Sequence, residues 1–152
     1  ETGTPKKHHI LTNGQFTAWS TPEELIFTKT KYLDSDIIIN KGTGQTDGYS
    51  GWEGRSDKGE TLESIIEPKT PHEKVKVFLG GLATDFCVKS TARDIAEHFK
   101  DDRRVTAYLL IDAIRAVGLT PTAEEEALSA MKEAGILAIS TEEAKKIIQE
   151  AI

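Results

Sequence analysis

Residues 80–89 read Gly-Gly-Leu-Ala-Thr-Asp-Phe-Cys-Val-Lys, and they join an apolar run to an amphipathic segment. The run at residues 75–79 predicts a buried strand, and the two glycines after it allow a sharp turn or a close approach to a ligand. Positions 88, 91, 92, 95, 96 and 99 define one face of a helix that Cys87 opens. We therefore expect strand, turn and helix in that order, with Asp85 as the helix cap.

The rest of the chain repeats this alternation of strands and helices. Apolar runs predict three further strands, at residues 36–40, 105–111 and 136–139. Capping patterns predict three further helices, one from residue 21 to about residue 27, one from residue 122 to 135 and one from residue 140 onward. Such alternation is typical of a mostly parallel sheet covered on both faces. We expect a single three-layer α/β/α domain of Rossmann-like type over residues 1–152.

Composition limits the classes of function. The chain has 152 residues, of which 38% are hydrophobic and 29% charged, and its net charge of −6 argues against a nucleic-acid partner. One cysteine excludes a disulfide within the chain, which fits a reducing compartment, so we expect a cytoplasmic protein. No apolar stretch reaches the length of a membrane span, and the N-terminus lacks the apolar run of a signal peptide, so no membrane partner is expected.

Cys87 is the first candidate for chemistry. Free N–H groups and partial positive charge at a helix N-terminus favour a thiolate, and the same donors can hold an oxyanion. A lone cysteine is otherwise often a small buried hydrophobe, and composition alone does not separate the two interpretations. The strand, turn and helix around Cys87 favour the nucleophile.

Lys41 is the second candidate. It follows three isoleucines and precedes Gly42, at the carboxyl end of an expected strand. Chemistry in parallel sheets gathers at the carboxyl ends of the strands, where Cys87 is also expected. A lysine beside a cysteine favours the thiolate and can stabilise developing negative charge, although most lysines are solvated surface charges. Spacing alone does not pair the two residues.

Three stretches, taken in order, resemble the nicotinamidases, a branch of the isochorismatase-like cysteine hydrolases: Lys41-Gly42-Thr43, Tyr49-Ser50-Gly51-Trp52 and Gly81-Leu82-Ala83-Thr84-Asp85-Phe86-Cys87-Val88. Further matches are Thr91-Ala92, Asp94, Asp112-Ala113 and a run ending in Met-Lys-Glu-Ala-Gly at residues 131–135. The resemblance covers roughly residues 36–140. The first and third stretches are specific together, and either alone would be weak.

The resemblance implies an amidohydrolase, of nicotinamidase or pyrazinamidase type, that converts nicotinamide to nicotinate and ammonia in NAD salvage. Cys87 would attack the carboxamide carbon and form a thioester, and Lys41 would be the basic member of an Asp–Lys–Cys triad. The backbone N–H groups of Ala83 and Cys87 would form the oxyanion hole, and the Leu82–Ala83 peptide would be cis.

The same resemblance implies a slot for the pyridine ring, lined by Tyr49, Phe86 and Trp19. Core packing is the alternative role for these aromatic residues, above all for Trp19, whose neighbours differ from the family pattern. The family also holds a divalent ion, often zinc. His9 and His8 are the candidate ligands, and two adjacent surface histidines are the alternative.

Two features of the family pattern are not found in this sequence: the triad aspartate and the Asp-x-His pair that binds the metal. Both belong to an N-terminal segment that the family places before anything matched here. Without the strand of that segment, the strand at residues 36–40 would have an exposed edge. We therefore expect an N-terminal fragment of the same protein as a second chain that supplies this strand.

Two other functions stay open. One is a different amidase of the superfamily, acting on a carbamoyl or ureido compound. The other is a non-catalytic homologue that serves as an interaction domain. Tyr49-Ser50 and the aromatic residue before Cys87 favour a small amide of the nicotinamide type as substrate. The oligomeric state, including a homo-oligomer, is left open by the sequence.

Overall fold

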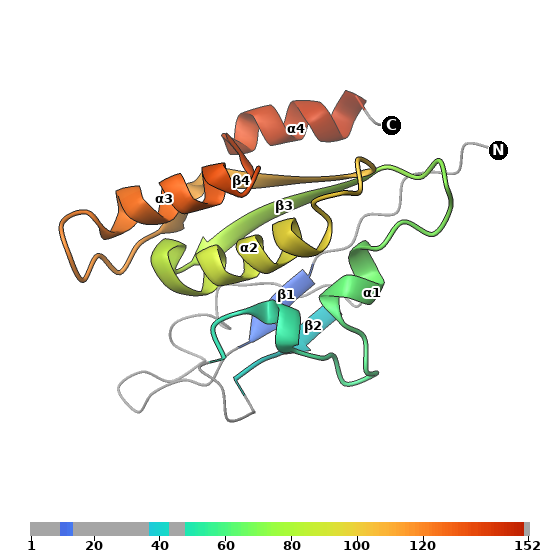
Figure 1. The fold of residues 1–152 in the computed structure, drawn as a ribbon, viewed down its shortest axis with the longest axis horizontal. Helices are drawn as coiled ribbons and strands as arrows, with labels where there is room; N and C mark the ends of the chain where they lie inside the picture. The colour runs from blue at the N-terminus through green and yellow to red at the C-terminus, as the bar shows by residue number, and fades with distance from the viewer. Residues whose placement is uncertain (1–9, 14–36, 43–47, 151–152) are drawn as a thin grey trace.

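The computed structural model describes residues 10–13, 37–42 and 48–150. From residue 37 onward, strands and α-helices alternate along the chain as expected, and a strand at residues 10–13 lies where the sequence predicted none (Figure 1). A 3-10 helix, η2 (Gly51–Glu53), and a π-helical turn, η3 (Thr84–Val88), complete the set. The strands and α-helices, in chain order, are β1 (Ile10–Asn13), β2 (Ile37–Asn40), α1 (Leu62–Ile66), β3 (Val75–Leu82), α2 (Lys89–His98), β4 (Val105–Arg115), α3 (Ala123–Glu133), β5 (Leu137–Ile139) and α4 (Thr141–Glu150).

Every pair of these strands runs parallel, which confirms the expected type of sheet. β4 lies between β3 and β5, with Val75 opposite Val105 and Tyr108 opposite Leu137. β1 pairs with β2, and among the described residues this pair has no ladder to the three-stranded sheet. Figure 1 shows β1 and β2 apart from β3 and β4. β3 is therefore an edge strand within the described part of the chain.

Helices cover both faces of the three-stranded sheet, as the three-layer fold requires. Helices α2 and α3 pack on one face, and the core between them and β4 consists of Val88, Ala92, Leu109, Met131 and Ile136. Helix α4 packs against β4 on the other side (Figure 1). It begins with the expected capping box, in which Ser140 and Glu143 each accept a hydrogen bond from the other's backbone N–H.

A second apolar cluster ties the β2 region to the rest of the molecule. Its buried members come from β2, α1 and the end of α2: Ile39, Leu62, Ile66, Ile95 and Phe99. Burial of these side chains stabilises the position of β2 against α2. The packing matters for the site because Lys41 directly follows β2 and Cys87 directly precedes α2.

The structure corrects several boundaries. β3 continues to Leu82, so both glycines lie inside the strand, where its pairing with β4 is irregular. The helical segment begins at Thr84, so Cys87 lies in its first turn and does not open it. β4 continues to Arg115, so Asp112 lies inside that strand. The helix expected at residues 21–27 falls outside the described residues.

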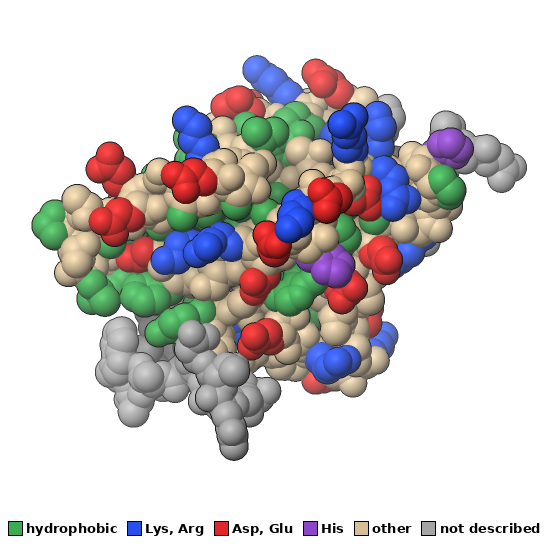
Figure 2. Space-filling view, viewed as in Figure 1, with side chains coloured by type: hydrophobic (Ala, Val, Ile, Leu, Met, Phe, Trp, Pro, Cys, Tyr) green, Lys and Arg blue, Asp and Glu red, His purple; other side chains and the backbone are tan. Residues whose placement is uncertain are grey.

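Acidic and basic side chains are interspersed over the face of the molecule formed by α2 and α3 (Figure 2). This mixture fits the modest net charge of −6. No helix in the described ranges is both long enough and apolar enough to cross a bilayer.

Candidate active site

Lys41 and Cys87 are in contact, although 46 positions separate them in the sequence. The Lys41 Nζ donates to Cys87 Sγ over 3.2 Å. Lys41 is 9% exposed and Cys87 is partly buried, so the pair is largely removed from water. A buried ammonium needs an anionic or strongly polar partner, and a thiolate meets that need. The structure thus brings together the two residues that the sequence could only place at the same edge.

The segment that starts at Gly48 contacts the lysine. The Lys41 Nζ also donates to the Gly48 carbonyl oxygen over 3.1 Å. Gly42 and Gly48 lie against one another with φ of +76° and +68°, and a Cβ on Gly48 would fall 2.4 Å from the Gly42 Cα. No other residue type fits that contact, because it combines left-handed backbone with a close approach. The two glycines therefore hold the loop ends together beside the ammonium.

Two aromatic residues adjoin this pair in sequence, since Tyr49 follows Gly48 and Phe86 precedes Cys87. The centroids of Tyr49 and Phe86 are 5.3 Å apart, with their planes inclined by 58°. Tyr49 is 40% exposed, so its ring forms part of the surface above the site. Trp19, the third expected aromatic, lies outside the described residues. Trp52 is turned elsewhere, against His98 and Phe99.

The backbone around Ala83 has the conformation that the resemblance implies. The Leu82–Ala83 peptide is cis, and Ala83 is the extended residue immediately before the π-helical turn. The Ala83 carbonyl accepts from the N–H groups of Phe86 and Val88. These bonds fix the start of the turn that carries Cys87.

Asp85 does not cap the helix, contrary to the sequence interpretation. Its carboxylate accepts from the backbone N–H groups of Val117 and Gly118, over 2.9 and 3.0 Å, and so binds the segment after β4 to the cysteine-bearing turn. Burial alone would raise the pKa of Asp85. The Gly118 and Val117 donors and the charge of Lys89 outweigh burial and hold that pKa below its ordinary value. Sequence patterns do not separate this long-range role from a cap, because both use a short carboxylate near a helix start.

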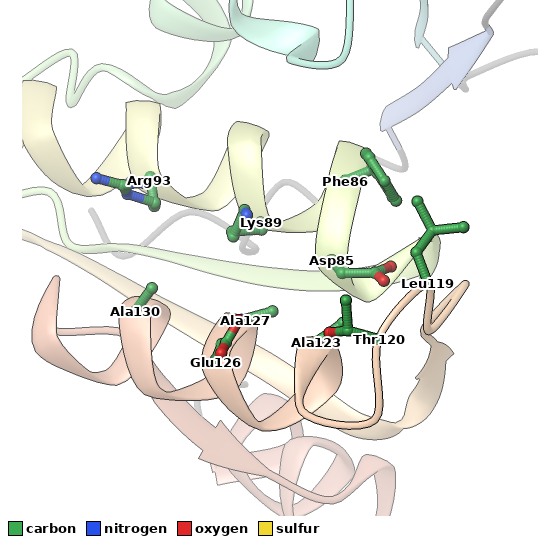
Figure 3. A pocket seen from close by; sticks show the side chains of 10 residues that line it. All are labelled: Asp85, Phe86, Lys89, Arg93, Leu119, Thr120, Ala123, Glu126, Ala127 and Ala130. Atoms are coloured by element: carbon green, nitrogen blue, oxygen red, sulfur yellow. The ribbon is translucent and has the colours of Figure 1, made fainter.

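A pocket lies between α2 and α3, next to the cysteine-bearing turn. Figure 3 shows Asp85 directed toward the segment after β4, and Phe86 and Leu119 approaching one another at the pocket's end. Lys89 and Arg93 line it from α2. Neither Lys41 nor Cys87 lines this pocket, so it is distinct from the cysteine–lysine site.

The described residues do not form a metal site. No three of their His, Cys, Asp and Glu side chains gather as a metal would require. His98 pairs with Glu63 at 3.2 Å, and His72 is exposed. The candidate ligands His8 and His9 lie outside the described residues.

No carboxylate of the described residues contacts the Lys41 ammonium. Asp85 is bound to Val117 and Gly118, and Asp112 accepts from the Thr141 N–H and hydroxyl over 2.8 and 2.7 Å. The third member of the expected triad is therefore not found in this part of the chain.

Comparison with solved structures relates this geometry to known proteins. The pyrazinamidase of Pyrococcus horikoshii, solved in complex with zinc, matches with a TM-score of 0.56 and 33% identity over 74% of this chain. PnC1 from L. infantum, solved with nicotinate, matches with a TM-score of 0.51 and 28% identity over 69% of this chain. The yeast nicotinamidase Pnc1p matches with a TM-score of 0.51 and 23% identity over 67% of this chain, which shows the fold alone.

These matches and the parallel sheet define the class: the chain has the isochorismatase-like α/β fold. Within that class it is nicotinamidase-like. The chain spans about half the length of the proteins that it matches, 55% of the pyrazinamidase and 48% of PnC1. No protein-family model matches the chain, and no curated protein matches it.

Proposed function

We propose that this chain carries the nucleophile of an amidohydrolase that converts nicotinamide, or a close relative such as pyrazinamide, to the carboxylate and ammonia. One observation carries the proposal: the Lys41 ammonium touches the Cys87 sulfur at 3.2 Å in a partly buried site. The likeness to a pyrazinamidase and to a nicotinate-bound protein supports the choice of substrate.

The proposed reaction has two stages. The Cys87 thiolate bonds to the carboxamide carbon, and the carbonyl electron pair moves to oxygen. Collapse breaks the C–N bond, and ammonia leaves with a proton from the acid–base group that includes Lys41. Water then bonds to the thioester carbon, the C–S bond breaks, and the carboxylate leaves. One proton of that water returns to the acid–base group in place of the proton given to ammonia, and the other passes to solvent, where ammonia takes it up as ammonium. Cleavage of the C–S bond restores the thiolate.

Two parts of the site would assist this chemistry. The backbone N–H groups of Ala83 and Cys87, at the start of the helical segment, are the proposed donors to the oxyanion. The Tyr49 and Phe86 rings are the proposed walls of the slot for the flat substrate ring, with Trp19 as a further candidate. An aromatic slot holds the carboxamide in place for attack and so lowers the entropic cost of the first stage.

A carboxylate is the proposed third member of the acid–base group. An ammonium has three N–H donors, and within the described residues Lys41 uses two, toward Gly48 and Cys87. A buried ammonium is stabilised by a second anion. We propose that an N-terminal fragment of the same protein supplies this carboxylate on a strand that covers an edge of β2; β3 is likewise an edge strand among the described residues.

A divalent ion, zinc for preference, is part of the proposal because the P. horikoshii protein is in complex with zinc. His9 and His8 remain the candidate ligands. Such an ion would anchor or polarise the substrate when bound, and no step above is routed through it. The cytoplasmic location and the place in NAD salvage stay predictions of the sequence.

The test is ammonia release from nicotinamide by the purified protein and by Cys87→Ala. We expect the substitution to abolish turnover, with a loss of at least about 1,000-fold, because the covalent stage has no substitute nucleophile. The matched control is Thr141→Val, which removes a hydroxyl whose hydrogen bond goes to Asp112. Turnover that survives in Cys87→Ala would contradict the thioester route.

A further inference from the structure

We propose that Thr91 is a positioning residue that holds Lys41 against Cys87. The inference rests on the proposed role of Cys87 as the nucleophile, and it adds a residue that touches neither the sulfur nor the ammonium. Thr91 lies on α2, four residues after Cys87, and is 8% exposed. Its Oγ1 accepts from the Gly51 backbone N–H over 2.8 Å, in a buried hydrogen bond.

This hydrogen bond connects the segment from Gly48 to Gly51 with α2, the helix that follows the cysteine. Gly48, Ser50 and Gly51 are all buried, so the loop has no water to replace a lost partner. A buried N–H left without an acceptor is destabilising, so loss of the acceptor favours movement of this segment. The bond links the Gly51 backbone directly to α2.

The loop transmits the position of Thr91 to the lysine. Three residues before Gly51, the Gly48 carbonyl accepts from the Lys41 Nζ, which also donates to Cys87 Sγ. Gly48 is packed against Gly42, immediately after the lysine. Loss of the Thr91 acceptor would therefore release the carbonyl that directs the ammonium, and the ammonium would spend less time at the sulfur.

The same loop carries Tyr49, whose ring meets Phe86 beside the cysteine. One hydroxyl thus sets two features, the ammonium that favours the thiolate and a wall of the proposed ring slot. A threonine at this place was part of the sequence resemblance, but no pattern in the sequence indicates that its hydroxyl reaches a loop 40 positions away.

The experiment measures how the alkylation rate of the cysteine varies with pH. Because the chain has one cysteine, iodoacetamide reports on Cys87 alone. In Thr91→Val, which keeps the shape and loses the acceptor, we expect the rate at neutral pH to fall about 3- to 10-fold. Thr91→Ser keeps the hydroxyl and should restore the wild-type profile.

Controls separate this role from simple support of the fold. Thr141→Val removes the hydroxyl that donates to Asp112 and should leave the profile unchanged even if the melting temperature falls. If Thr91→Val does not fold, Thr91→Ala lacks the same acceptor with less bulk. A profile that is unchanged in folded Thr91→Val or Thr91→Ala, despite a lower melting temperature, would overturn the proposal.

Substrate does not enter the alkylation assay, so the two proposals can fail separately. If the profile shifts as expected but the protein releases no ammonia from nicotinamide, Thr91 positions the pair and the proposed substrate is wrong. If ammonia is released through Cys87 and the profile does not shift, the amidase proposal stands and the positioning role falls.

Discussion

At the scale of single residues, the site depends on side chains whose partners are distant in sequence. Lys41 donates a hydrogen bond to Cys87, and Thr91 accepts one from Gly51. Asp85 lies two residues before the cysteine and accepts hydrogen bonds from two backbone N–H groups after β4. Its carboxylate holds that segment against the cysteine-bearing turn, so its charge state should affect the stability of both.

The pKa of Asp85 lies below its ordinary value of 3.8, which gives a prediction with a definite sign. A carboxyl with a lowered pKa in the folded state stabilises the protein above the ordinary value, and this contribution is lost as the pH falls through the lowered one. We expect Asp85→Asn to reduce the free energy of unfolding at pH 7 by about 1 kcal/mol, and the difference from wild type to shrink below about pH 4.

Chemical denaturation at a series of pH values measures this difference. Asp101→Asn is the matched control, because it removes the same charge from an exposed position. Asp101→Asn should follow the wild type throughout. A constant difference between Asp85→Asn and wild type from pH 7 to pH 3 would show that the charge of Asp85 plays no part.

At the scale of the elements, the sequence predicted strand and helix identity better than their ends. β2 and β5 are apolar runs between polar or glycine residues, and their bounds were close to expectation. β3 and β4 run further because backbone pairing continues past the apolar residues, with Gly81 opposite Ile114. Hydrophobicity indicates burial, but parallel pairing needs only a backbone in reach.

The start of the helical segment that carries Cys87 shows a second limit of prediction from hydrophobic periodicity. The periodicity from Val88 onward was real, and Val88, Ala92 and Ile95 are buried. The π-helical turn before it has a different period, so an i, i+3, i+4 pattern does not detect it. The placement of Cys87 near a helix N-terminus survives this error, because the turn adds only a few residues ahead of it.

Part of the candidate site could likewise be predicted from the sequence, and part could not. The alternation of strands and helices in the sequence predicts a parallel sheet. Lys41 and Cys87 both follow carboxyl ends of its strands, so their placement at the same edge of the sheet could be predicted. Their direct contact depends on how β2 packs against α2, and this is a property of the tertiary fold. The roles of Asp85 and Thr91 were missed because each acts on a backbone amide that no local pattern identifies.

At the scale of the whole molecule, two parallel sheets face the site without a ladder between them among the described residues. Within the described residues, β3 is an edge strand and one N–H of Lys41 has no acceptor, and the proposed fragment would supply both partners. We predict that an N-terminal fragment of the protein purifies with the 16.7 kDa chain. Its removal should abolish ammonia release, and its return should restore it.

Intact and native mass spectrometry of the purified protein check this prediction. The intact spectrum should show two polypeptides and the native spectrum their complex. A single species of 16.7 kDa that releases ammonia at the full rate would contradict it. Exchange of the fragment's carboxylate for an amide provides the matched control, since the strand would still pair while the acid–base group lost its anion.

The proposed chemistry depends on the contact between Lys41 and Cys87. The alkylation profile of Lys41→Met tests whether this contact makes the cysteine reactive. Lys89→Met is the control, because it removes the same charge two residues from Cys87 on a side chain whose field acts on Asp85. We predict that Lys41→Met lowers the rate at neutral pH about 10-fold or more while Lys89→Met stays near wild type. Equal profiles for Lys41→Met and wild type would contradict the account.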